Sequence, residues 1–236
     1  LTLAPHNSVV TLLEELDGMI EKAKALLAGA MDVSGVAKPV AVFNPTSWAR
    51  SEVVEIDGRQ VAVSVPAMGY AVAELAGLPA VVSQEAPADR LENEKLRVLF
   101  NEDGTISSLY DKEEDREILR ENAVGNALMM YEEEYTHWDI NKNYMACTPE
   151  QAKLVSAKGF ARGVVKGIAM EYTVGQSAIS QTVILRDGSK QLDFETTVDW
   201  NETYKMLRSS FPVDIVTDSA RCEIQYGHLL RPTHQN

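Results

Sequence analysis

The stretch that decides the fold is Lys153–Trp200, which reads KLVSAKGFARGVVKGIAMEYTVGQSAISQTVILRDGSKQLDFETTVDW. Short runs rich in β-branched and aromatic residues follow one another in it, and Asp187-Gly188-Ser189 marks a tight turn before the last run. No helical stripe separates these runs, so they predict strands of an antiparallel sheet. The runs are Lys153–Phe160, Val164–Tyr172, Ser177–Leu185 and Leu192–Trp200.

The same pattern extends outward from this stretch in both directions. Glu94–Phe100 and Thr105–Tyr110 are β-forming runs on either side of a turn at Asn101–Gly104. Further runs follow at Ala127–Tyr131, Tyr204–Phe211 and Ala220–Tyr226. Many short strands at roughly regular spacing indicate antiparallel sheets packed face to face, so we expect one large β-sandwich domain over residues 89–236.

A smaller β-rich domain is expected at residues 37–88. Three short β-forming runs occupy Val40–Phe43, Glu52–Ile56 and Gln60–Val65. Asp57-Gly58 joins the last two and predicts a hairpin with a type I′ turn, because those positions need positive φ. Pro, Ala and Ser accumulate from Pro79 to Asp89, as they do in linkers.

The N-terminal segment has a different pattern. From Val9 to about Ala30 the apolar residues recur with a 3.6-residue period and face a polar side, which predicts an amphipathic helix capped by Asn7 or Ser8. Such an apolar stripe must pack against another element, and no second helix follows it in the sequence. We therefore expect residues 1–36 to be the end of a helical domain whose other helices lie upstream.

Composition limits the partners and the compartment. The 236 residues carry a net charge of −13, which argues against nucleic acid and anionic membranes as partners. No apolar run is long enough for a membrane span, and no signal peptide is present. The two cysteines, Cys147 and Cys222, sit in no metal-binding spacing. We expect both to be buried thiols in a reducing cytoplasm.

The densest polar and aromatic patch is Tyr131–Tyr144, which has no period of two and is expected to be a long loop. Its Tyr, Trp and Asp residues suit carbohydrate, because an aromatic ring can cover the C–H face of a sugar while a carboxylate accepts from hydroxyls. The alternative is a solvated acidic loop with Trp138 in the core. The four histidines have no zinc-protease spacing, and no phosphate loop or nucleophile elbow is present, so no catalytic residue is assigned.

Several motifs resemble those of the α-mannosidases of glycoside hydrolase family 38. VFNPTSW is similar to the family's FNPxSW, and LENEKLRVLFNEDGTISSLYDK is similar to its LENExLRVxFxEDGTIxSLYDK. The resemblance covers nearly everything from residue 40 to residue 236, in the family's order. The segments that carry it are Val42–Trp48, Leu91–Lys112, Gly125-Asn126, Asp199–Asp214 and Gln225–His234.

This resemblance implies the fold and the activity of a parent enzyme. Members of the family are zinc-dependent retaining exo-α-mannosidases that hydrolyse terminal α-mannosides, and an N-terminal domain supplies the zinc ligands and an aspartate nucleophile. A three-helix domain and β-sandwich domains follow, the largest resembling the galactose mutarotase-like supersandwich. The chain is then mainly β, truncated at its C-terminal end and inactive by itself. Zinc is expected in the parent enzyme, none is expected in this chain alone, and family members are often homo-oligomers.

The resemblance also directs attention to particular residues. The β domain in this family closes one side of the sugar pocket, which makes Tyr135, Trp138 and Asp139 the first choice for contacts with the α-mannoside. Arg231 and His234 are the second choice, with a structural turn as the alternative.

One element departs from the family pattern. Pro5-His6-Asn7-Ser8 resembles a Pro-His-Asp-Ser element whose histidine binds zinc, but Asn7 stands at the aspartate position. His6 is therefore only a weak candidate for a metal ligand, because a lone histidine does not hold zinc firmly. A competing hypothesis for the whole chain is a free-standing carbohydrate-binding or mutarotase-like β-sandwich.

Overall fold

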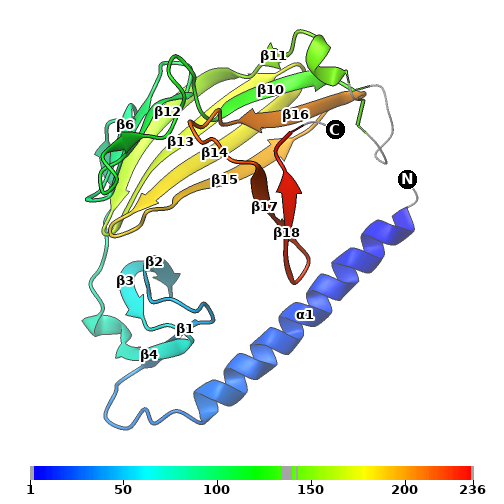
Figure 1. Ribbon diagram of the computed structural model, residues 1–236. Coiled ribbons are helices and arrows are strands. Elements are labelled where there is room, and N and C mark those ends of the chain that lie inside the picture. The colour runs from blue at the N-terminus through cyan, green and yellow to red at the C-terminus, as the bar shows by residue number, and fades with distance from the viewer. Residues whose placement is uncertain (1–2, 134–139, 142, 235–236) are drawn as a thin grey trace. The chain divides into compact units, whose positions relative to one another are not determined.

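The computed structural model describes residues 3–133, 140–141 and 143–234, with side chains described from Val9 onward. The chain divides into two compact units, unit 1 (Leu1–Val81) and unit 2 (Val82–Asn236). Antiparallel strands dominate and one long helix stands at the N-terminal end of the described part, which confirms the predicted fold class (Figure 1). Of the helices in this part, none has the length and apolar character that a bilayer span requires.

Unit 1 begins with helix α1 (Leu3–Gly29), which starts earlier than the predicted Asn7 or Ser8 cap. Pro5 explains the difference, because proline is tolerated in the first turn of a helix, where backbone N–H groups have no intrahelical partner. The apolar stripe of α1 is exposed, and Leu26 keeps 77% of its surface accessible. The helix therefore presents an apolar face that no described residue covers.

The remainder of unit 1 is a small β structure. Strands β2 (Arg50–Ile56) and β3 (Arg59–Val65) form the predicted hairpin, with Asp57 at φ 49° and Gly58 at φ 73° as a type I′ turn requires. Strand β1 (Pro39–Asn44) pairs with β4 (Gly69–Glu74), which the 3₁₀ helix η1 (Leu75–Gly77) follows. The core of this unit is formed by the inward side chains of β3: Val61, Val63 and Val65.

The side chain of Asn44 holds the FNPTSW segment together. Its buried side-chain amide donates to the backbone oxygens of Trp48 (2.7 Å) and Pro66 (2.9 Å). Its Oδ1 accepts from the backbone N–H (3.1 Å) and the hydroxyl (2.6 Å) of Thr46. One side chain thus bonds to polar groups of two segments and ties them together. A small domain needs such bonds because its apolar core is limited.

Unit 2 contains the large sheets of the described chain. A five-stranded antiparallel sheet has the order β15-β14-β13-β12-β5, and shorter sheets have the orders β6-β7-β8-β9, β11-β10-β16 and β17-β18 among the described residues. The five-stranded sheet comprises β5 (Gln84–Ala86), β12 (Lys153–Arg162), β13 (Val165–Val174), β14 (Ser177–Arg186) and β15 (Leu192–Asp199). The strands predicted within Lys153–Trp200 are confirmed.

The shorter sheets of unit 2 include strands that the sequence predicted and four that it did not, namely β6, β9, β11 and β18. Strand β18 was not predicted as separate from the run ending at Tyr226. The remaining strands are β6 (Arg90–Glu92), β7 (Leu96–Phe100), β8 (Ile106–Asp111), β9 (Arg116–Glu117), β10 (Ala127–Glu132), β11 (Glu150–Gln151), β16 (Lys205–Ser210), β17 (Ser219–Ile224) and β18 (Gly227–Pro232); the 3₁₀ helix η2 spans Tyr144–Ala146.

The core of unit 2 lies between the five-stranded sheet and the shorter sheets that cover one of its faces (Figure 1). Strand β7 shows the alternation clearly, because Leu96, Val98 and Phe100 are buried and the residues between them are not. Buried residues of β13 and β14, such as Ile168 and Val183, belong to the same cluster. This two-layer arrangement confirms the predicted β-sandwich.

A chain of polar side chains crosses that core. Asn126, only 2% exposed, donates from Nδ2 to Oε1 of Gln181 at 2.7 Å. Gln181 donates in turn to the hydroxyl of Thr196 at 3.0 Å, and the hydroxyl of Ser209 donates to Oδ1 of Asn126 at 3.3 Å. The chain links β16 and the residue before β10 to β14 and β15 of the opposite layer.

The cysteine prediction was wrong. Both are free thiols, Cys147 is exposed and Cys222 is half-buried. Cys147 directly follows η2 in a surface loop, and Cys222 lies in β17, part of a hairpin that is mostly exposed. The general tendency of cysteine to be buried does not hold where the surrounding segment is itself at the surface.

The turn between β7 and β8 is tightly packed at Gly104. This glycine has φ 80°, and its N–H donates to the carbonyl of Asn101 at 3.0 Å. A Cβ added at Gly104 would lie 2.4 Å from the hydroxyl oxygen of Tyr172 in β13. The turn predicted from Asn101–Gly104 is thus confirmed, and it needs glycine for both conformation and space.

We predict that Gly104→Ala destabilises unit 2 by about 2–5 kcal/mol, since left-handed strain of about 1–2 kcal/mol adds to overpacking of about 1–3 kcal/mol. Gly188→Ala is the matched control, because Gly188 has φ 73° and an added Cβ would meet nothing closer than Glu94 at 3.5 Å. Gly188→Ala should therefore lose only the free energy of the left-handed strain, about 1–2 kcal/mol. Urea unfolding measures both, and equal losses would show that Tyr172 does not restrict the turn.

Candidate functional site

The loop after β10 contains the patch predicted to contact sugar, and the structure describes both of its ends. The backbone N–H of Glu133 donates to the carbonyl of Tyr204 at 2.8 Å. The N–H of Asn141 donates to the Glu133 carboxylate at 3.2 and 3.3 Å, and the N–H of Asn143 donates to Oδ1 of Asn141 at 2.9 Å. The two ends of the loop are therefore held together at Glu133.

Aromatic rings fix the end of the loop to the sheet. The rings of Tyr131 and Tyr144 meet edge to face, with centroids 5.3 Å apart and planes at 83°. The guanidinium carbon of Arg208 lies 5.0 Å from the centroid of the Tyr144 ring, within the range of a cation–π interaction. Tyr131, Tyr144 and Arg208 form what we call the ring cluster, and it anchors η2 to strands β10 and β16.

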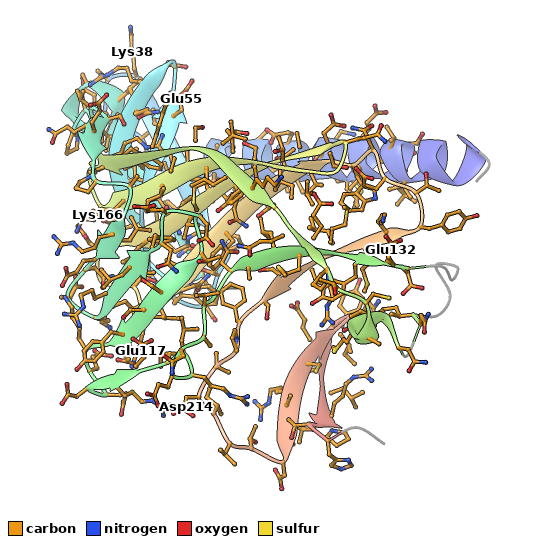
Figure 2. All side chains as sticks on the ribbon, turned by 90° about the horizontal axis from the view of Figure 1, so that it is seen from above. Lys38, Glu55, Glu117, Glu132, Lys166 and Asp214 are labelled. Atoms are coloured by element: carbon orange, nitrogen blue, oxygen red, sulfur yellow. The ribbon has the colours of Figure 1, made fainter. Side chains whose placement is uncertain are left out.

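The opposite face of the same strand pair has charged side chains at its end. Lys205 in β16 pairs in register with Glu132 in β10, and their side chains form an ion pair. Figure 2 shows Glu132 at the end of β10 where this strand leaves the sheet. Aromatic and charged groups therefore surround the two points at which the loop begins and ends, a mixture that suits a hydroxyl-rich ligand.

The first-choice site residues Tyr135, Trp138 and Asp139 lie outside the described residues. Arg231 lies in β18 opposite Ala220, and His234 follows that strand; both side chains are exposed. Within the described part of the chain, neither side chain has a hydrogen-bond or ion-pair partner, and no interaction joins them to the ring cluster.

His6 lies in the first turns of α1, and its side chain falls outside the described side chains. Across the side chains that are described, no group of three or more His, Cys, Asp or Glu residues lies close enough together to hold a metal ion. The described side chains therefore offer no ligand set for zinc.

Sequence reasoning missed a hollow of about 620 Å³ beside the β7–β8 turn. Asp103 stands in its wall, and its oxygens accept from the N–H of Thr105 (3.0 Å), the hydroxyl of Thr105 (2.6 Å) and the amide of Gln151 (3.0 Å). Burial raises the pKa of Asp103, but these hydrogen bonds outweigh it and hold the pKa below its usual value. The hollow is lined by Glu102, Asp103, Glu150, Gln151, Ala152, Lys153 and Leu154.

Two further carboxylates of unit 2, the buried Asp111 and the half-buried Glu117, are held by hydrogen bonds. Asp111 accepts from Lys190 at 2.7 Å, which holds the pKa of Asp111 below its usual value. Burial raises the pKa of Glu117, yet its bonds from the Ser108 hydroxyl and three backbone N–H groups keep that pKa low. A glycosidase acid needs a raised pKa, so these groups, ionised at neutral pH, are not suited to that role.

The Leu91–Lys112 motif has a structural explanation in the same contacts. Asn93 is buried and donates to the carbonyls of Arg186 (2.6 Å), the last residue of β14, and Ser189 (2.7 Å) in the loop that follows. Lys112 pairs with Glu92 at 2.6 Å and donates to the carbonyl of Asn93 at the same distance. The residues that define the motif therefore connect β6, β8 and the β14–β15 loop.

The fold and these contacts define an antiparallel β-sandwich domain. The profile of the glycosyl hydrolases family 38 C-terminal domain matches residues 91–236, and the chain belongs to this family.

Individual relatives agree with this assignment. Alpha-mannosidase 2C1 of Mus musculus and that of Homo sapiens are each 30% identical over 234 residues, which cover 91% of this chain and 22% of theirs. Alpha-mannosidase G of Dictyostelium discoideum is 28% identical over 167 residues, 66% of this chain and 15% of its own. The chain thus spans about a fifth of the length of the first two relatives.

A solved structure has the same fold. The crystal structure of an alpha-mannosidase from Enterococcus faecalis V583 matches 84% of this chain and 27% of its own, with a TM-score of 0.57 and 16% sequence identity. At that identity the similarity concerns the fold alone.

The hydrogen bonds of Asp103 predict a pH dependence. A carboxyl whose pKa is lower in the folded state contributes stability that is present above its unfolded pKa, near 3.8. This stability is lost as the pH falls through the lower folded value. Asp103→Asn should therefore make the stability of unit 2 fall less steeply between about pH 5 and pH 3 than in the wild type.

Urea midpoints measured across that pH range test this prediction. Thr105→Val is the companion variant, because it removes the hydroxyl donor and should reduce the same slope. A wild-type slope in Asp103→Asn would contradict the assignment of acid sensitivity to this carboxylate.

Proposed function

We propose that this chain is the β-sandwich part of a retaining exo-α-mannosidase that hydrolyses terminal α-mannosides. The observation that carries the proposal is the family 38 C-terminal profile match over residues 91–236. The relatives with the longest matches reported above are themselves α-mannosidases, which supports a mannoside as the substrate class.

In this proposal the β-sandwich supplies one wall of the sugar site. Tyr135, Trp138 and Asp139 contact the α-mannoside, and the hydrogen bonds at Glu133 support this role because they fix the ends of the loop that contains these residues. Arg231 and His234 are secondary candidates on the exposed end of β18.

The chemical step belongs to residues beyond this chain. A retaining glycosidase needs one carboxylate as nucleophile and a second carboxyl group that first donates and then accepts a proton. The described carboxylates whose pKa is shifted all have lowered values, which favours a structural role for them: Asp32, Glu92, Asp103, Asp111 and Glu117. We assign zinc to the parent enzyme on the family resemblance alone.

The free cysteines support the cytoplasm as the location, because an exposed thiol such as Cys147 is stable where thiols are kept reduced.

The test compares this chain with the complete protein encoded by its reading frame. The complete protein should hydrolyse p-nitrophenyl α-mannoside, leave p-nitrophenyl β-mannoside intact, and release mannose first as the α anomer, as double displacement requires. The chain alone should give no turnover with added zinc.

Zinc-dependent turnover by the chain alone would overturn the proposed division of roles. If the complete protein hydrolysed no α-mannoside while the chain bound mannose in calorimetry and Trp138→Ala weakened that binding, the free-standing carbohydrate-binding module would be favoured instead.

A further inference from the structure

Three Asp-Gly pairs stand in turns between strands: Asp57-Gly58, Asp103-Gly104 and Asp187-Gly188. In such a pair the backbone nitrogen of the glycine can attack the side-chain carboxyl carbon of the aspartate, because no side chain on the glycine obstructs the approach. The reaction needs a carboxyl group and an N–H group without other partners, and a backbone that can rotate. The three pairs meet these conditions to different degrees.

Asp57-Gly58 connects β2 to β3, and both residues are exposed. Within the described part of the chain, neither the Asp57 carboxylate nor the Gly58 N–H has a hydrogen-bond or ion-pair partner. Apart from the glycine and its chain neighbours, no heavy atom lies within 4 Å of the point that a Cβ would occupy at Gly58. Strands β2 and β3 form a two-stranded sheet, and a hairpin of this kind opens locally at a low cost in free energy. The carboxyl group, the amide and the backbone are therefore all free to react.

Asp103-Gly104 is the opposite case. The Asp103 carboxylate accepts hydrogen bonds from Thr105 and Gln151. The N–H of Gly104 donates to the carbonyl of Asn101 at 3.0 Å, and Gly104 is buried. Ring closure here would have to break hydrogen bonds to a charged group and displace a packed turn, so the fold protects this pair.

Asp187-Gly188 is intermediate between the other two pairs. Both residues are exposed, but Oδ1 of Asp187 accepts from Nζ of Lys166 at 3.0 Å. The N–H of Asp187 also donates to the carbonyl of Val164 at 2.8 Å, which fixes the backbone on one side of the pair. Because an exposed ion pair contributes only a small free energy, this pair is protected less than Asp103-Gly104.

We propose that Asp57 is a modification site at which aspartate converts spontaneously to isoaspartate. The Gly58 nitrogen forms a bond to Cγ of the protonated Asp57 carboxyl group, and the amide proton and the carboxyl hydroxyl leave together as water. Water then attacks the former backbone carbonyl of the resulting succinimide ring and breaks its bond to the Gly58 nitrogen. One water is released and one is consumed, so no oxidant or reductant takes part. The chain then continues through the side chain of Asp57, which lengthens the backbone by one carbon.

Isoaspartate at this position changes the structure of unit 1. The type I′ turn has two residues, and it sets the register in which Ile56 pairs with Arg59. An extra backbone carbon removes that geometry at the start of β3, whose Val61, Val63 and Val65 form the core of the unit. The modification therefore lowers the stability of unit 1, and this holds whether or not the parent enzyme is an α-mannosidase.

The test incubates the folded chain at neutral pH and maps its peptides by mass spectrometry, with electron-transfer fragmentation to distinguish isoaspartate from aspartate. Isoaspartate should accumulate at Asp57 at least about tenfold faster than at Asp103, because breaking one hydrogen bond to a charged group raises the barrier enough for that factor. Asp187 should react at an intermediate rate. Equal rates at Asp57 and Asp103 in the folded chain would overturn the proposal.

Two controls separate the effect of the fold from that of the sequence. In guanidinium chloride all three pairs should react at similar rates, because the contacts that distinguish them are lost. Lys166→Met keeps the apolar stem and removes the charged partner of Asp187, so it should raise isoaspartate at Asp187 and leave the rate at Asp57 unchanged. Isoaspartate that forms at Asp57 only in guanidinium chloride would show that the hairpin protects this residue, which also overturns the proposal.

Discussion

The hydrogen bond between the amides of Asn126 and Gln181 is the constraint on which the architecture of unit 2 depends. A β-sandwich can bury apolar faces in more than one register, because apolar contacts are not directional. Two amides buried in its core are directional, because burying each of them costs free energy unless it forms a hydrogen bond. In the observed alignment of the two layers the amides pair with each other, and the hydroxyls of Thr196 and Ser209 complete the chain.

The motifs that mark the family are explained by the same kind of constraint. Asn44 satisfies backbone groups around the FNPTSW turn, Asn93 connects β6 to the β14–β15 loop, and Asp111 pairs with Lys190 in that loop. Each is a buried polar group that needs these partners, because a buried polar group without a hydrogen bond costs free energy. The resemblance therefore identifies the fold through residues that stabilise it, whereas Arg231 and His234, which are proposed to contact sugar, are exposed in and just after β18.

The parts of the fold that could be predicted from the sequence are those that local patterns determine. The strands within Lys153–Trp200 and the Asp57-Gly58 hairpin are confirmed because alternation and turn chemistry are local properties. Strand β18 was missed because Gln225-Tyr226 contains none of the residues that usually mark a turn. Nothing in the sequence marks the positive φ of Tyr204 (56°), because an aromatic residue rarely adopts this conformation. Of the predicted site residues, only Arg231 and His234 lie within the described side chains, and both are exposed.

The most direct measurement of the central claim is a double-mutant cycle at Asn126 and Gln181, followed by urea unfolding of unit 2. Each single change to alanine should cost about 1–3 kcal/mol, because it leaves the other amide buried without its partner. The double variant should cost at least about 1 kcal/mol less than the sum of the two. Additive losses would contradict the claim, since they would mean that the two amides stabilise the sandwich independently and do not set its alignment.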